Sequence, residues 1–149
     1  MAKQSESNFI DMIGDLFAKA PALPNNFKET LVKITPIISL IFGILGLLVG
    51  IMGLTSLSIF SPFALLGGPD TVRSYGGGMI STLTLIVSSG LLLAAYPGTK
   101  ARKINGWNML FWSEVVNIAG SVISLNILGA VVSALIGFYI LFQIKSHYK

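Results

Sequence analysis

Three long stretches of this sequence carry almost no charge, and they limit the folds that the chain can adopt. Residues 34–69 and 74–99 contain no charged side chain, and residues 104–144 contain only Glu114. Buried helices of soluble domains usually keep a charged outer face, and small domains leave most residues near the surface. Only 11% of the residues are charged, against about 25% in a typical soluble domain. The sequence therefore predicts an integral membrane protein of one domain.

The apolar stretches divide into four segments that are each long enough for a membrane helix, since about 20 residues cross a core of about 30 Å. The predicted spans are about residues 34–54, 77–96, 107–125 and 127–144. As a single helix, residues 106–144 would be about 58 Å long, so we expect a tight turn at residues 124–126, where Asn126 tolerates a left-handed conformation. The predicted fold class is all-α, with two helical hairpins packed as a small four-helix bundle.

A polar and amphipathic segment, residues 1–33, precedes the first span. Two short helices are expected around the break at Pro21 and Pro24, the first capped by Asn8 and the second by Asn26. The apolar residues of the first helix fall on one face. We predict an interfacial helix that lies in the plane of the lipid headgroups, and packing against the rest of the protein is the alternative.

Basic residues indicate the orientation in the membrane. Nine of the ten Lys and Arg residues precede the first span, lie between the second and third spans, or follow the fourth; the exception is Arg73. The positive-inside rule therefore predicts that both termini, including the tail 145–149, and the loop 97–105 are cytoplasmic, in an inner or plasma membrane. The linker 55–76 is expected at the outer interface, as a short helix broken at Pro62.

Small residues follow one face of the first span and recur in the fourth. The first glycine seam consists of Ser39, Gly43, Gly46, Gly50 and Gly53, and the second glycine seam consists of Gly129, Ser133 and Gly137. In lipid, small residues let helix backbones approach closely, as in a glycine zipper. The seams therefore predict close helix contacts, either within one chain or between chains.

A second pattern consists of polar residues in the second and third spans. These are Ser81, Thr84 and Ser88 of the second span and Glu114, Asn117, Ser121 and Ser124 of the third. A carboxylate at that depth costs about 2.5–3.5 kcal/mol on insertion scales, so Glu114 should face protein or water rather than lipid. One hypothesis is a protonatable site on an ion or proton path. The other is a protonated Glu114 that forms a hydrogen bond with a hydroxyl of the second span.

No motif indicates an enzyme, a cofactor, a metal site or nucleic-acid binding. The chain has no Cys, its single His147 lies in the tail, and it contains no HExxH, GxSxG or Walker motif. The expected partners are membrane lipid and either further copies of the chain or a larger membrane complex. The leading hypothesis is a non-enzymatic assembly or accessory subunit that packs through its glycine seams. The alternative is an oligomeric channel or transporter with a protonatable site at Glu114.

Overall fold

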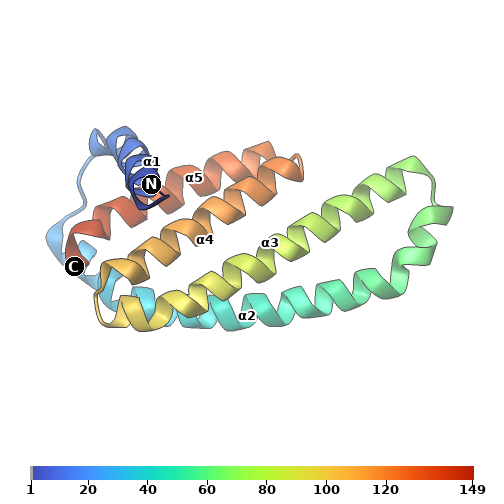
Figure 1. Cartoon of the computed structure of the whole chain (residues 1–149), viewed down its shortest axis with the longest axis horizontal. Coiled ribbons are helices and arrows are strands. Elements are labelled where there is room, and N and C mark those ends of the chain that lie inside the picture. The colour runs from blue at the N-terminus through green and yellow to red at the C-terminus, as the bar shows by residue number, and fades with distance from the viewer. Residues whose placement is uncertain (1) are drawn as a thin grey trace.

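The protein consists of five α-helices and one short 3-10 helix (Figure 1). The computed structural model describes residues 2–149, and the side chains of residues 2–6 and 65 lie outside that description. The helices are α1 (Ala2–Ala18), α2 (Asn25–Leu66), α3 (Pro69–Lys100), α4 (Ile104–Ile123), α5 (Ile127–Ile144) and η1 (Lys145–His147). The described residues form no strand, so the prediction of an all-helical chain is confirmed.

Three of these helices are long and apolar enough to cross a membrane, which indicates a membrane protein. They are α2 and α3, and α5 together with η1. The third predicted span, α4, is less apolar, because Glu114 and several Asn residues interrupt it. Three of the four predicted spans therefore lie in helices that are long and apolar enough to cross a membrane, and α4 does not meet the same criterion.

Helix α2 is much longer than predicted. The second N-terminal helix, the first span and most of the outer linker form one helix of 42 residues, about 63 Å long. The expected cap Asn26 lies inside its first turn, and the expected break at Pro62 does not occur. Proline leaves the carbonyl four residues earlier without its helical partner. Here the Ser61 hydroxyl donates to that carbonyl, the Ser58 oxygen, at 3.0 Å, so the freed carbonyl keeps a hydrogen bond and the helix continues past Pro62.

The connections between the long helices are short. Gly67 and Gly68 join α2 to α3, and Gly68 has a positive φ of 83° that favours glycine. Residues 101–103 join α3 to α4, so the expected loop 97–105 is mostly helical. The α4–α5 turn lies at residues 124–126 as predicted, but Leu125 takes the positive φ of 61°. Asn126 instead caps α5, because its Oδ1 accepts the Gly129 N–H.

The helices are arranged in chain order as two antiparallel hairpins, α2–α3 and α4–α5 (Figure 1). Helix α4 lies between α3 and α5, whereas α2 and α5 contact each other much less. Both chain termini and the α3–α4 turn lie at one end of the molecule, which we call the terminal end. At the opposite, far end, the α2–α3 hairpin projects beyond the α4–α5 turn.

Helix α1 crosses the α4–α5 hairpin near the terminal end (Figure 1). It begins at Ala2, so Asn8 lies inside the helix and does not cap it. The Phe9 ring stacks on Trp112 and the Phe17 ring on Phe142, with ring centroids about 6.1 Å apart in each pair. One side of the apolar face of α1, with the buried Ile10, thus packs against the protein, as in the alternative interpretation of the sequence, whereas Met12 and Leu16 are 59% and 74% exposed.

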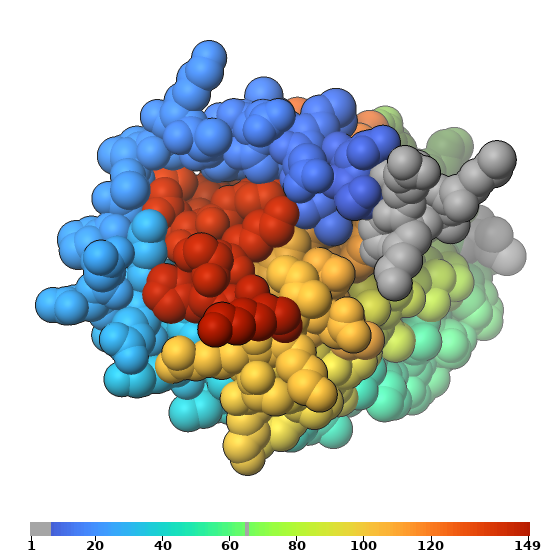
Figure 2. Space-filling view, turned by 60° about the vertical axis from the view of Figure 1, so that its left-hand side comes forward, coloured from blue at the N-terminus to red at the C-terminus, as the bar shows by residue number. Residues whose placement is uncertain are grey.

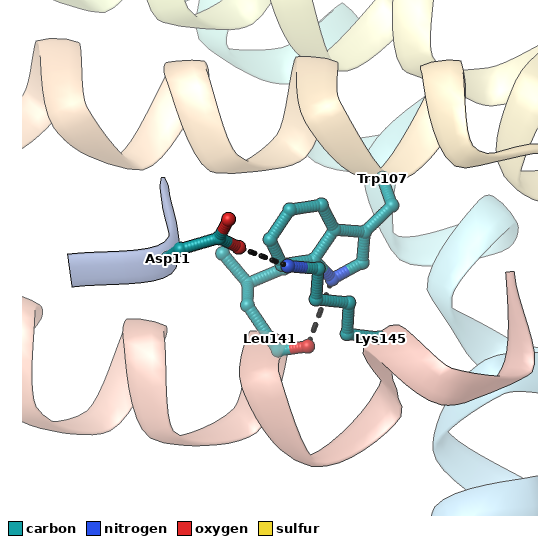
Figure 3. Close-up of polar contacts among 4 residues, drawn as sticks. All are labelled: Asp11, Trp107, Leu141 and Lys145. Carbon is teal, nitrogen blue, oxygen red and sulfur yellow. Dashed lines mark hydrogen bonds and ion pairs between the residues drawn. The ribbon is translucent and has the colours of Figure 1, made fainter. Parts of the chain in front are cut away.

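An ion pair and an indole hydrogen bond join α1, α4 and the end of α5 (Figure 3). Lys145 Nζ lies 3.5 Å from Asp11 Oδ1 and 5.1 Å from the centre of the Trp107 ring. Trp107 Nε1 donates to the Leu141 carbonyl oxygen at 2.8 Å. These contacts fix the terminal end around a buried aromatic core that includes Trp107 and Phe111.

The C-terminal residues fill the centre of the terminal end, between the N-terminal segment and the α3–α4 turn (Figure 2). The Ile104 N–H donates to the Lys149 oxygen at 2.8 Å, and the Lys149 N–H donates to the Arg102 oxygen at 2.9 Å. Tyr148 is only 5% exposed. The predicted tail 145–149 is therefore a packed element of the fold.

Candidate functional site

Polar side chains of α3 and α4 gather in a cavity between these two helices, which we call the middle cavity. It has a volume of about 250 Å³ and is lined by Ser81, Thr84, Leu85, Asn117, Gly120, Ser121, Ser124 and Asn126. Five of the seven predicted polar residues are among them. The Ser81 and Ser124 hydroxyl oxygens lie 3.1 Å apart and link the two helices. The helical spacing of the α4 residues thus places them on the face that α3 partly covers.

Glu114 lies in a second cavity, toward the terminal end, which we call the Glu114 cavity. Its volume is about 310 Å³. All four long helices line it, through Leu31, Ile34, Thr35, Ile38, Ser39, Leu92, Leu110, Ser113, Glu114, Asn117, Gly137, Ile140, Leu141 and Ile144. Asn117 lines both this cavity and the middle cavity, so the two adjoin at its side chain.

The hydrogen-bond partner of Glu114 is a residue of α5. The Ser133 hydroxyl donates to Glu114 Oε1 at 2.5 Å. The sequence had suggested a hydroxyl of the second span as this partner, and the structure shows Ser133 instead. Gly137, one turn further along α5, leaves the space that the carboxyl occupies, because an added Cβ would overlap it.

The hydroxyls around Glu114 are largely used by backbone carbonyls. Thr35 donates to the Leu31 oxygen, Ser39 to the Pro36 oxygen, and Ser113 to the Ser88 oxygen. Ser88 therefore contributes its carbonyl to the α3–α4 contact and does not line either cavity.

A third cavity, which we call the far cavity, lies between the projecting part of α3 and the α4–α5 turn. Its volume is about 690 Å³, and Arg73 and Ser74 are among its lining residues. It shares Ser81, Ser124 and Asn126 with the middle cavity. The three cavities therefore adjoin one another along α4, from the far end to Glu114.

The first glycine seam packs against α3 of the same chain. A Cβ added at Gly43 would meet Leu93, at Gly46 Ser89, at Gly50 Ile86, and at Gly53 Thr82. Ser39 is buried at the start of the seam. Of the second glycine seam, Ser133 and Gly137 contact Glu114 of α4, whereas Gly129 packs beside the capping Asn126. Both seams thus form contacts within the chain.

Sequence reasoning missed a close approach of two helix backbones, at Gly98 of α3 and Gly106 of α4. A Cβ added at Gly98 would lie 2.6 Å from the Gly106 Cα atom, so only glycine fits there. The sequence signal is a glycine on either side of a short basic turn. This contact brings the end of α3 against the start of α4.

Comparison of the chain with protein-family models, curated proteins and solved structures finds no match. Function is therefore inferred from the site alone.

Proposed function

We propose that the protein is a small carrier or channel that moves a proton or another cation across a membrane, with Glu114 as the cation-binding group. The observation that carries this proposal is the chain of adjoining cavities along α4, which runs from the far end to Glu114. Hydroxyl and amide groups line the middle cavity, and such groups stabilise water or ions inside a membrane. An intramembrane carboxyl at the end of a polar path is typical of proton and cation relays.

The proposal includes four spans, α2 to α5. Helix α4 has 20 residues, which is long enough for a core of about 30 Å. Its lower hydropathy is accounted for by its position between α3 and α5, because Glu114, Asn117 and Ser121 then face protein and cavities. With the basic residues gathered at the terminal end, that end is cytoplasmic and α1 lies at the cytoplasmic interface.

Glu114 is suited to bind a positive charge because nothing in the described chain neutralises it. The ion pairs among the described residues join Glu29 to Lys33 and Asp11 to Lys145, and neither involves Glu114. Ser133 donates a single hydrogen bond to one carboxyl oxygen. An ionised carboxylate in such surroundings gains stability from a proton or a bound cation.

The test is cation flux into liposomes that contain the purified protein. We expect proton or monovalent-cation flux above that of protein-free liposomes, and its loss in Glu114→Gln, which keeps the shape and removes the charge. Glu29→Gln is the matched control, because Glu29 is an exposed carboxyl that pairs with Lys33 outside the cavities. Equal flux in wild type and Glu114→Gln, or no flux in wild type, would overturn the proposal.

An assembly or accessory subunit remains a second candidate, supported by the projecting tip of α2. Ile59, Phe60, Phe63 and Leu66 are each at least 60% exposed there, beyond the α4–α5 turn. An exposed cluster of large apolar side chains favours contact with another protein. In mild detergent, a complex whose mass falls to that of one chain in Phe60→Ser with Phe63→Ser would support this candidate. A wild-type mass of one chain would exclude it.

A further inference from the structure

The wall of the Glu114 cavity differs from that of the middle cavity, because it is mostly aliphatic. Eight of its fourteen lining residues are Leu or Ile. Two of its lining residues also reach the outer surface of the molecule on α2, where Ile34 and Ile38 are 38% and 44% exposed. On a helix that crosses a membrane, that surface faces lipid. An apolar compound dissolved in the bilayer can therefore reach Glu114 from this side.

The polar groups that a bound molecule would meet in this cavity are few. The hydroxyls of Thr35, Ser39 and Ser113 donate to backbone carbonyls. Glu114 keeps one carboxyl oxygen that accepts no hydrogen bond from the described residues, and the Asn117 side chain forms no hydrogen bond with them. Both groups offer acceptor oxygens on the same face of α4, one turn apart.

The charge on the wall of the Glu114 cavity is negative, because it comes from Glu114. Glu114 is faced by Ser133 and Gly137 from α5, by Thr35 and Ser39 from α2, and by Leu92 from α3. None of these residues titrates or carries a charge. Glu114 is also the one charged residue among those that line the cavity.

We infer that the Glu114 cavity binds a small amphiphilic amine, whose ammonium group donates to Glu114 and Asn117 and whose apolar group lies among the Leu and Ile side chains of α2 and α5. The inference rests on the proposed function, because it names the class of cation carried. Ligand cavities have volumes from about 300 Å³, which suits one compact apolar group here. Alkyl amines resemble the Lys side chain, with a pKa near 10.4, and are cations at neutral pH.

The experiment measures saturable binding of 2-phenylethylamine to the whole protein in lipid nanodiscs. Its matched probes are 2-phenylethanol, which is neutral, phenylacetate, which is an anion, and methylammonium, which has the charge without the apolar group. We expect binding of the amine alone among the four, weakened at least about tenfold in Glu114→Gln, since a hydrogen bond to a charged group is lost. Binding should also weaken as the pH is lowered, because protons compete for the carboxylate.

A second variant tests the aliphatic part of the site without touching the charge. Ile140 lines the cavity, whereas Ile136, one turn earlier on α5, is 57% exposed on the outer surface. Ile140→Phe should weaken amine binding, and Ile136→Phe should leave it unchanged.

The outcomes separate this inference from the proposed function. Equal binding of 2-phenylethanol would mean that lipid chains or any apolar molecule fill the cavity, and would overturn the inference. Equal binding of methylammonium, or cation flux that depends on Glu114 without amine binding, would overturn it and leave the proposed function intact. Amine binding that depends on Glu114 in a protein without any flux would instead support the site and overturn the transport function.

Discussion

At the scale of single residues, two side chains at the terminal end differ in how their polar atoms are satisfied. The Trp107 indole donates to the Leu141 carbonyl, as buried Trp side chains usually do. The buried hydroxyl of Tyr148 has no hydrogen-bond partner among the described residues. A buried polar atom without a partner lowers stability. Tyr148 is therefore the residue in the tail whose change is most informative.

Tyr148→Phe should raise the free energy of unfolding by up to about 1 kcal/mol, because it removes a buried hydroxyl and keeps the ring. Burial raises the pKa of Tyr148, and the Thr35 hydroxyl and the Arg102 charge oppose that rise. A raised pKa in the folded state means that the neutral phenol is favoured there. Stability is then complete below the ordinary pKa of about 10 and is lost as the pH rises through the folded-state pKa.

The measurement is the unfolding transition of wild type and Tyr148→Phe in detergent, at neutral pH and on the alkaline side. Wild type should lose more stability than the variant as the pH rises. Tyr139→Phe is the control, because the Tyr139 hydroxyl donates to the Pro21 oxygen at 2.7 Å and its loss should destabilise the protein. Equal alkaline losses in wild type and Tyr148→Phe would contradict the assignment.

At the scale of helices, the α2–α3 hairpin depends on glycines that let two backbones approach. Gly46 lies against Ser89, and Gly50 against Ile86, so the first glycine seam is occupied by α3. In lipid, close packing replaces the hydrophobic effect as the force between helices. The hairpin should therefore be sensitive to added volume along this seam and tolerant of it elsewhere.

Gly46→Leu should lower the melting temperature, with a loss of about 1–3 kcal/mol, because the larger side chain pushes α2 away from α3. Gly90→Leu is a matched control in α3, since no atom lies within 4 Å of the Cβ that it would add. Thermal unfolding of both variants gives the comparison. Similar melting temperatures for the two variants would show that the seam does not hold the hairpin together.

At the scale of the whole molecule, the arrangement in the membrane depends on α4. If α4 crosses the bilayer, the α3–α4 turn and the start of α5 lie on opposite sides. The molecule places them at opposite ends, with the α3–α4 turn at the terminal end and the α4–α5 turn toward the far end (Figure 1). Because the chain has no Cys, a single introduced thiol can be detected without background.

Single-cysteine variants labelled with a membrane-impermeant reagent should divide into two groups. Ala101→Cys should react only from the cytoplasmic side, and Thr71→Cys and Ile127→Cys only from the other side. All three positions are exposed in the fold. Ile127→Cys is decisive, because reaction from the same side as Ala101→Cys would mean that α4 does not span the membrane.

Much of this protein could be predicted from the sequence, because the features concerned are local. Long apolar stretches without charge cannot remain in water, so they determine the helices and the membrane class. The turn at residues 124–126 followed from the length of the apolar stretch. The 3.6-residue period was enough to place Glu114, Asn117 and Ser121 on one face of α4.

Only the tertiary structure decided which residues meet across helices. Ser133 and not a hydroxyl of α3 is the partner of Glu114, since that choice depends on how α5 lies against α4. The structure shows that α2 continues through Pro62 and that the Ser61 hydroxyl donates to the freed Ser58 carbonyl, neither of which composition reveals. The glycine seams were visible as patterns in the sequence. A pattern of small residues predicts that another helix approaches closely, but it does not identify that helix. Contacts between distant segments are set by the packing of the whole bundle, and so the cavities along α4 appear only when all its helices are in place.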